Sequence, residues 1–353
     1  MIARPFLAAA LALTALTVAV RAGRPDGAVT LSIVGTTDQH GYVFPREGRG
    51  GLELFGGYVK NLRAARQADA GAVVLVDSGD TYQGGIESNL SEGALVVDAY
   101  NALGYAAVAF GNHEFEFGAV DTWDDRPPSP DLRGALKARA RQARFPMLAA
   151  NLHDVDPARP VAWDNVQPSV LIDAAGVKVG LIGVMTRDAL SMTLAANIVG
   201  LSVSPLVPAI QREAERLRRQ GAQVVVVASH AGGSCNAFAT PEDLSSCDDR
   251  AEIFEVARQL PRGLVDAIAA GHTHANVAHV VNGVAIGNSL GMIPGTSRSG
   301  AGVTPPSLAA SRDGAALAPK ASSGNRSTPS VRGPSGSTRS PVMITWCSGR
   351  SQG

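Results

Sequence analysis

The stretch VVLVDSGDTYQGG, residues 73–85, joins an apolar run to a polar, glycine-flanked segment that contains Asp80. A near-continuous run of Val and Leu is typical of a strand buried on both faces of a parallel sheet. The glycines allow the backbone to turn sharply after the strand and to approach a ligand closely. The stretch therefore predicts a buried strand that ends in a ligand-binding loop.

Similar apolar runs recur along the chain and are separated by amphipathic segments. With the strand of the opening stretch placed at 72–77, the further strands are expected at 29–34, 106–110, 146–151, 178–184, 223–229, 265–270 and 281–287. Helices are expected at 54–67, 94–103, 132–144, 207–220 and 250–259. Apolar strands that alternate with helices indicate an α/β fold whose sheets are covered by helices.

Length and composition limit the class of protein. The chain has 353 residues, of which 45% are hydrophobic and 18% charged, enough for one large α/β domain or two modest ones. The formal net charge is zero, but residues from Thr296 onward carry seven Arg or Lys against one Asp. The remaining body is mildly acidic, so nucleic acid is not expected as a partner.

The N-terminus has the pattern of a signal peptide over residues 1–22. Arg4 precedes the apolar segment PFLAAALALTALTVAV, and small residues at Val20 and Ala22 suit cleavage. A buried first helix and a retained anchor are the alternatives, although the run is short for a membrane span. We expect an exported protein, periplasmic or secreted, without a stable membrane anchor.

Export affects how the cysteines are interpreted. Cys235 and Cys247 lie twelve residues apart in a polar segment, and an oxidising compartment would join them as a disulfide. Two free thiols are the alternative, and metal binding by the pair is less favoured because nothing nearby completes a four-ligand set. Cys347 is left over, near the C-terminus.

The C-terminal segment differs in character from the domain expected at residues 28–289. Residues 290–353 are rich in Ser, Gly and Pro and show no apolar periodicity, which predicts a disordered tail. A basic linker is one interpretation of this tail. A shifted reading frame is the other, since the strand pattern stops abruptly after VAIGNS.

Polar residues follow five of the expected strands, in each case flanked by glycine. These residues are Asp38 and His40, Asp80, Asn112 and His113, His230, and His272 and His274. Taken singly, such an Asp is usually a turn or helix cap, and such a His is usually hydrogen-bonded surface. In α/β sheets, however, ligands bind outside the carboxyl ends of strands, so the five clusters together predict one shared site.

The residue types in these clusters indicate a metal site. Carboxylates and imidazoles together suit divalent transition ions, and no thiolate is present to favour a closed structural zinc site. Asp38 and His40, like His272 and His274, are two residues apart, which points both side chains the same way on an extended backbone. Asp80 could bridge two ions through its two oxygens.

These motifs resemble those of the calcineurin-like metallophosphoesterases, and within them the exported 5′-nucleotidase / UDP-sugar hydrolase family. The resemblance rests on DQH, GDTYQG, GNHE, SHAGG and GHTH, and it covers residues 29–289. It implies a two-sheet αββα sandwich. It also implies a second, C-terminal domain for substrate selection, which the tail at 290–353 would replace.

The resemblance further implies a role for each position. Asp38, His40 and His274 would hold one divalent ion, Asn112, His230 and His272 a second, and Asp80 would bridge them. The ions would be two of Mn, Zn, Fe or Co, and a hydroxide shared between them would attack phosphorus. His113 would be the catalytic histidine that stabilises the phosphoryl charge or protonates the leaving group.

The two acids after His113 are expected to differ in role. Glu116 stands where the family commonly has Asp, and it would orient His113; Glu114 is expected to anchor the loop. The expected activity is metal-dependent hydrolysis of a small phosphate ester, with a nucleotide as the expected substrate and without a protein partner. The alternatives are an inactive remnant of a nucleotidase and an exported metal- or phosphate-binding protein without turnover.

Overall fold

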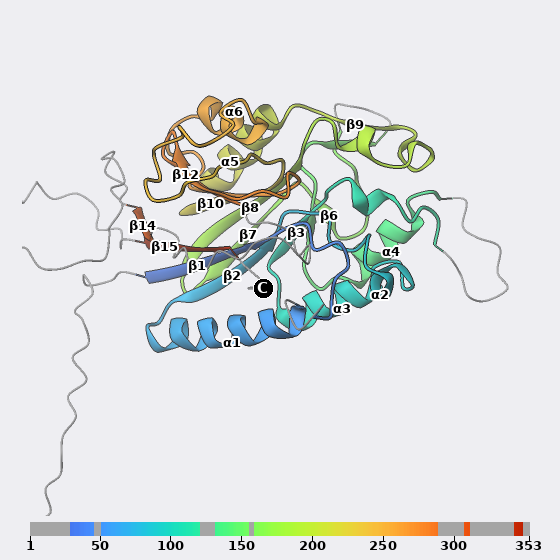
Figure 1. Ribbon diagram of the computed structural model, residues 1–353, viewed down its shortest axis with the longest axis horizontal. Coiled ribbons are helices and arrows are strands. Elements are labelled where there is room, and N and C mark those ends of the chain that lie inside the picture. Colours follow the sequence, from blue (N-terminus) through green and yellow to red (C-terminus); the bar gives the residue numbers. More distant parts are fainter. Residues whose placement is uncertain are drawn as a thin grey trace, which may run out of the picture.

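Two β-sheets lie face to face, and helices cover the outer face of each sheet (Figure 1). This arrangement is the αββα sandwich that the sequence predicts. The computed structural model describes residues 29–45, 51–120, 131–154 and 159–288, together with the backbone of 307–310 and 342–348.

The first sheet is built mainly from the N-terminal half of the chain. Its order is β14-β15-β1-β2-β3-β4-β6, and every neighbouring pair is parallel except β14 with β15. Its strands are β1 (Val29–Thr36), β2 (Ala72–Asp77), β3 (Ala107–Ala109), β4 (Met147–Leu148), β6 (Val166–Gln167), β14 (Ser307–Ala310) and β15 (Val342–Ser348).

The second sheet is built from the segment that follows. Its order is β12-β13-β11-β10-β8-β7, with a parallel centre and an antiparallel strand at each edge. Its strands are β7 (Ser169–Ala174), β8 (Val177–Met185), β10 (Val224–His230), β11 (Ala267–Ala270), β12 (Val277–Val281) and β13 (Val284–Asn288). A separate antiparallel pair joins β5 (Leu152–Asp154) to β9 (Leu201–Val203).

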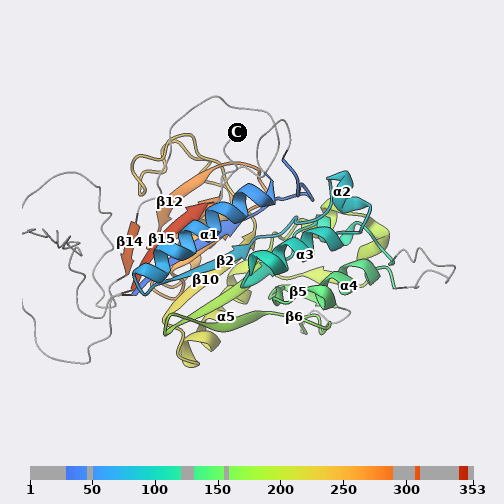
Figure 2. The same cartoon turned by 90° about the horizontal axis from the view of Figure 1, so that it is seen from below.

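The helices divide between the two outer faces. Helices α1, α3 and α4 pack on the first sheet and are seen crossing it in Figure 2, whereas α5 and α6 pack on the second. The helices are α1 (Leu52–Ala68), α2 (Ile86–Asn89), α3 (Ala94–Leu103), α4 (Gly134–Gln142), α5 (Leu206–Arg219) and α6 (Glu252–Gln259), with 3₁₀ turns η1 (His113–Phe115), η2 (Ala189–Met192) and η3 (Ala195–Ile198). Within the described ranges, no helix combines the length and apolar character that crossing a bilayer requires.

The near-continuous apolar strands are explained by burial on both faces. In β1, Leu31 and Ile33 point between the sheets, whereas Val34 packs toward the helices. In β10, Val226 points between the sheets and Val227 packs toward α5 and α6. Burying each such side chain stabilises the fold by about 1.5–3 kcal/mol.

One expected strand, 281–287, is wrong at its start. The chain instead forms a hairpin of β12 and β13, whose turn is made by Asn282 and Gly283. Both residues have positive φ, 53° and 83°, as a type I′ turn requires, and Asn-Gly is the preferred sequence for it. The turn therefore divides the apolar run into two antiparallel strands.

Eleven residues of the segment expected to be a disordered tail form strands, namely β14 and β15. Strand β15 pairs in parallel with β1 from Val29↔Val342 to Gly35↔Ser348, and β14 pairs with β15. The β15 sequence VMITWCS is rich in residues that favour strands. It pairs with the side of β1 that β2 does not occupy, where the backbone groups of β1 would otherwise lack partners. The rest of residues 290–353, and the expected signal peptide at 1–22, lie outside the described residues.

Cys235 and Cys247 form the disulfide that the sequence predicts. The two cysteines also pair as an isolated antiparallel bridge, so they close the segment between them into a loop. This segment, residues 235–247, is called the disulfide loop below.

Candidate metal centre

The predicted site residues lie at the carboxyl ends of β1, β2, β3, β10 and β11: His230 is the last residue of β10, and the others lie on the segments that follow the other four strands. The strands are parallel within each sheet, so their loops leave the sheets at the same end. The backbone N–H of His40 donates to the carbonyl of Asp80 at 2.9 Å and joins the first two loops. The N–H of His272 donates to Oδ2 of Asp38 at 3.0 Å and joins the two sheets.

Five of the seven predicted ligands have a left-handed backbone. The φ angles are 52° for Asp38, 47° for His40, 56° for Asp80, 73° for His272 and 49° for His274. A residue with a Cβ in this region costs about 1–2 kcal/mol. Such strain persists only where the surroundings hold the backbone, and it is concentrated at functional sites.

Asp38, His40 and His274 form the first group of donors. The Nε2 atom of His274 lies 3.3 Å from Oδ1 of Asp38 and 3.0 Å from Nε2 of His40. Asp38 is fully buried, whereas the side chain of His274 is 31% exposed. The three residues therefore form a half-open cluster that reaches the surface at His274.

A second group of donors surrounds His230. Its Nε2 atom lies 3.1 Å from Oδ2 of Asp80, 3.1 Å from Oδ1 of Asn112 and 3.1 Å from Nδ1 of His272. Asp80 also lies in a group with His40 and His113 whose donor atoms are all within 4.8 Å of one another. Asp80 therefore connects the two groups, as a bridging ligand would.

The donor atoms fit divalent cations. Two pairs of imidazole nitrogens face each other, at 3.0 Å for His40 and His274 and at 3.1 Å for His230 and His272. Two neutral ring nitrogens at this distance direct lone pairs at each other unless a proton or a cation lies between them. Nitrogen and carboxylate or amide oxygen donors, without thiolate, match transition metals such as Zn and Mn.

Backbone carbonyls orient two of the imidazole rings. Nδ1 of His230 donates to the carbonyl of Ser78 at 2.9 Å, and Nδ1 of His40 donates to the carbonyl of Gln83 at 3.1 Å. Each bond places the N–H on Nδ1 and leaves Nε2 free for a cation. The sequence gives no sign of these partners, because backbone carbonyls carry no residue signature.

His113 lies beside the donor groups rather than within them. Its backbone N–H donates to Oδ1 of Asp80 at 2.9 Å, and its ring meets that of His40 edge-on, with centroids 5.0 Å apart. Its Nδ1 atom lies 3.0 Å from Oε2 of Glu116, an ion-pair distance, although the angle is too bent for a hydrogen bond. The side chain of His113 is 29% exposed, so a bound ligand can reach it.

Glu114 anchors the loops, as the sequence suggests, through four hydrogen bonds to its carboxylate. Its buried carboxylate accepts bonds from the N–H groups of Asp80 at 3.0 Å, Thr81 at 2.7 Å and Gly111 at 2.6 Å. It also accepts a bond from the Thr81 hydroxyl at 2.7 Å. Glu114 thus fixes the backbone on both sides of Asp80 and joins it to the loop of Asn112.

The charges at the site are strongly coupled. Burial lowers the pKa of His230, but the charge and hydrogen bond of Asp80, with the charges of Asp38 and Glu114, outweigh it and raise that pKa to about 10. Burial raises the pKa of Asp80, but His230 and His113 outweigh it and lower the net value. Without a cation, the acids therefore hold a proton on His230.

A buried network lies below the Asp80 loop and was not predicted. Asp77 accepts bonds from the hydroxyls of Thr36 at 2.5 Å and Tyr100 at 2.9 Å, and from the N–H of Gly79 at 2.8 Å. Burial raises the pKa of Asp77 to about 7, against the opposing effect of these bonds. The bond to Gly79 shapes the turn that presents Asp80.

The sequence of this chain is similar to those of known proteins. Residues 31–276 match the sequence model of the calcineurin-like phosphoesterases. Protein UshA of Yersinia enterocolitica is 27% identical over 250 residues, which are 70% of this chain and 41% of that protein. A 5′-nucleotidase of Vibrio cholerae is 28% identical over 257 residues, 71% of this chain and 41% of its own length.

A solved structure has the same fold. The 5′-nucleotidase precursor of Thermus thermophilus superposes with a TM-score of 0.52 and 23% identity, covering 69% of this chain and 41% of that one. This chain thus spans about two fifths of the length of the two curated relatives above.

Proposed function

Because this chain belongs to the calcineurin-like phosphoesterase family, we propose that it hydrolyses phosphate esters with two divalent cations held where the two sheets meet. The observation that carries this proposal is the convergence of oxygen and nitrogen donors from the carboxyl ends of five strands. Two pairs of these donors are facing imidazole nitrogens, at 3.0 and 3.1 Å, an arrangement that a cation between them would stabilise.

The proposed ligand sets follow the two donor groups. Asp38, His40 and His274 hold one cation, Asn112, His230 and His272 hold the other, and Asp80 contacts both. Groups of three of these side chains with donor atoms within 4.8 Å of one another support the assignment. We propose that two cations bind and that each is Mn, Zn, Fe or Co, since all four accept such donors.

Bound divalent cations would supply a water with a lowered pKa and would stabilise charge on the phosphoryl oxygens. His113 could reach a phosphoryl group bound beside Asp80, because its side chain is partly exposed and its Nε2 lies 3.9 Å from Oδ2 of Asp80. In its charged form it stabilises an equatorial oxygen or transfers its Nε2 proton to the leaving oxygen. Glu116 lies beside this ring, with Oε2 3.0 Å from Nδ1 of His113, on the side away from Asp80, and we propose that it orients the ring.

The proposed substrate class is nucleotides. The support comes from relatives named 5′-nucleotidase, of which this chain spans about two fifths. We further propose that the protein is exported, which the disulfide between Cys235 and Cys247 supports because such bonds persist in oxidising compartments.

The test is to purify the full chain, measure its metal content, and assay 5′-AMP, UDP-glucose and a simple phosphodiester with and without Mn²⁺. Two cations per chain and release of phosphate from 5′-AMP are expected. Asp80→Ala should abolish both, whereas Asp164→Asn, an exposed acid remote in sequence from the donor loops, should leave both intact.

Other outcomes would favour other functions. A chain that binds cations but hydrolyses none of the three substrates would be an exported metal- or phosphate-binding protein. A folded chain that binds no cation would be an inactive remnant, and the proposal would be wrong.

A further inference from the structure

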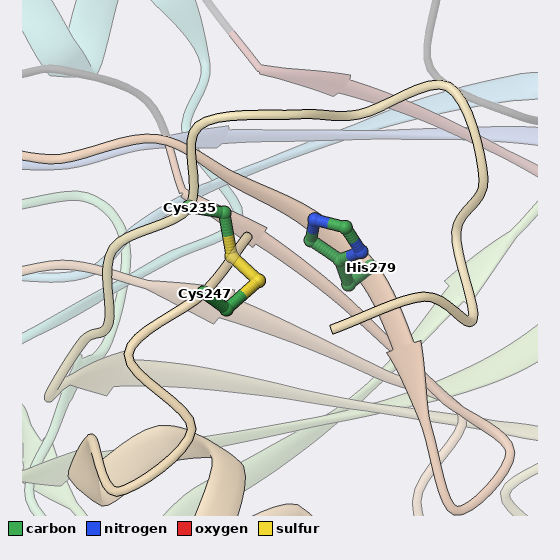
Figure 3. A group of neighbouring side chains, drawn as sticks. All are labelled: Cys235, Cys247 and His279. Carbon is green, nitrogen blue, oxygen red and sulfur yellow. A yellow bond between two sulfur atoms is a disulfide. The ribbon is translucent and has the colours of Figure 1, made fainter. Parts of the chain in front are cut away.

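The disulfide loop lies against strand β12, which begins three residues after His274. Figure 3 shows the His279 ring of β12 beside the disulfide, with the chain between the two cysteines passing around it. Cys235 and His279 are both buried, at 5% and 2% exposure. Cys235, Cys247 and His279 all lie outside the proposed ligand sets.

The start of the disulfide loop contacts the segment that carries His272 and His274. The N–H of Cys235 donates to the carbonyl of Asn276 at 3.0 Å. Just before the loop, the carbonyl of Gly233 accepts a bond from the Thr273 hydroxyl at 2.9 Å. Gly232 lies so close that a Cβ there would be 2.2 Å from the carbonyl oxygen of Gly271. The two backbones therefore lie too close together at this point to admit a side chain at Gly232.

His279 fastens the far side of the disulfide loop. Its Nδ1 lies 3.0 Å from the carbonyl oxygen of Pro241, and its Nε2 lies 3.0 Å from that of Ala237. In either tautomer, a ring N–H of His279 donates to one of these two carbonyls of the disulfide loop. Asp243 of the same loop interacts electrostatically with the ring, and the Val280 N–H adds a bond to Pro241 at 2.8 Å.

The ligand segment needs such support. His272 and His274 have φ angles of 73° and 49°, and the residues between β11 and β12 form no helix or strand. A non-glycine residue in the left-handed region returns to a common conformation when its surroundings loosen. A change in the disulfide loop would therefore displace both imidazoles from the centre.

We propose that Cys235, Cys247 and His279 are positioning residues for His272 and His274. The disulfide closes the loop, His279 ties the closed loop to β12, and the loop holds the two imidazoles in place. This inference rests on the proposed metal centre. It predicts that the metal affinity of the chain depends on residues that do not touch the metal.

The test uses the full chain stripped of metal and titrated with Mn²⁺, with free Mn²⁺ followed by electron paramagnetic resonance. The variants are His279→Gln, which keeps the disulfide, and Cys235→Ser with Cys247→Ser, which opens the loop. Both should bind Mn²⁺ about 10–100-fold more weakly than the parent chain, the range for residues that orient metal ligands. Reduction of the parent chain should reproduce the effect and should not alter the double serine variant.

The control separates local positioning from overall stability. Val59→Ala opens a cavity in helix α1, where Val59 is 1% exposed and packs on the first sheet. It should lower the melting temperature but leave the Mn²⁺ affinity unchanged. Amide exchange of residues 271–280 should rise in the disulfide-loop variants, while that of 29–36 stays constant.

Two results would overturn the inference. Unchanged Mn²⁺ affinity in both disulfide-loop variants would show that the loop positions nothing. Equal weakening by Val59→Ala would show that affinity follows overall stability. If the parent chain binds Mn²⁺ without hydrolysing esters, the proposed function fails while the positioning role can still be measured; if it binds no Mn²⁺, both fail.

Discussion

The carboxylate of Glu114 accepts a hydrogen bond from the backbone N–H of Asp80, 3.0 Å away, although the two residues lie on different loops. The same carboxylate takes bonds from Thr81 and Gly111 and is fully buried. The backbone of Asp80 is thus held by the carboxylate of Glu114, and its side chain is held separately by the backbone N–H of His113.

Replacing Glu114 with Gln should weaken the metal centre without removing a ligand. The amide NH₂ cannot accept hydrogen bonds, so buried N–H groups lose their acceptor at a cost of about 1–3 kcal/mol. We expect Mn²⁺ affinity to fall about 10–100-fold. Glu53→Gln, an exposed change in α1, is the matched control and should alter neither stability nor affinity. Retention of full affinity in Glu114→Gln would show that the loops hold Asp80 without this acid.

Replacing His113 with Ala should separate chemistry from metal binding. Its side chain lies beside the donor groups, so its loss should lower turnover about 10²–10⁴-fold, as for an acid–base group. The metal content measured on the purified variant should not change. Glu116→Gln should have a smaller effect on turnover in the same assay. A His113→Ala chain that has lost its metal would show that the ring is a ligand.

Asp77 should give the stability of the metal-free chain a distinct pH dependence. Its pKa is about 7 when folded against an ordinary value of 3.8, so between these values the folded chain keeps a proton that the unfolded chain releases. The contribution of Asp77 to the free energy of unfolding therefore falls as pH rises through this window, by about 4 kcal/mol in total. Urea unfolding in EDTA at pH 5 and pH 8 should detect about 2–3 kcal/mol of this fall, since that interval covers only the upper part of the window.

Asp77→Asn provides the comparison for that measurement. The amide does not titrate, so the variant should lose less stability than the parent chain between pH 5 and pH 8. An identical loss in both chains would mean that Asp77 keeps an ordinary pKa when folded.

Metal binding should release protons at mildly alkaline pH. The pKa of His230 is about 10 without a cation, so at pH 8 a cation has to displace its proton. Calorimetry in buffers of different ionisation enthalpy should detect about one released proton per chain. Affinity should rise up to about tenfold per pH unit between pH 7 and 8.5. Heats independent of the buffer would contradict a protonated His230.

Much of the fold could be predicted from sequence wherever an element is long and buried. Strand β2 and helix α3 have the predicted limits, because an apolar run and a periodic segment ending at Gly104 mark them clearly. Strands β5 and β9 were not predicted, since three residues show no periodicity. The strand β12 was missed because the Asn-Gly turn signal at Asn282 was passed over.

The site was predictable in its members but not in its supports. Asp38, Asp80 and the histidines stand out because each follows an apolar run. Asp77 does not stand out, since it ends the run itself and only the fold brings Thr36 and Tyr100 to it. His279 lies outside every motif, and its two carbonyl partners carry no signal in the sequence.

The origin of the donor residues in two parts of the chain has a practical consequence. Residues before Pro168 supply Asp38, His40, Asp80 and Asn112, whereas residues after it supply the three histidines of the second sheet. Cations at this junction would act as a reversible cross-link between two consecutive segments of one chain. A chain cut at Pro168 would give two fragments whose association strengthens with cation concentration, so the scaffold could serve as a split reporter.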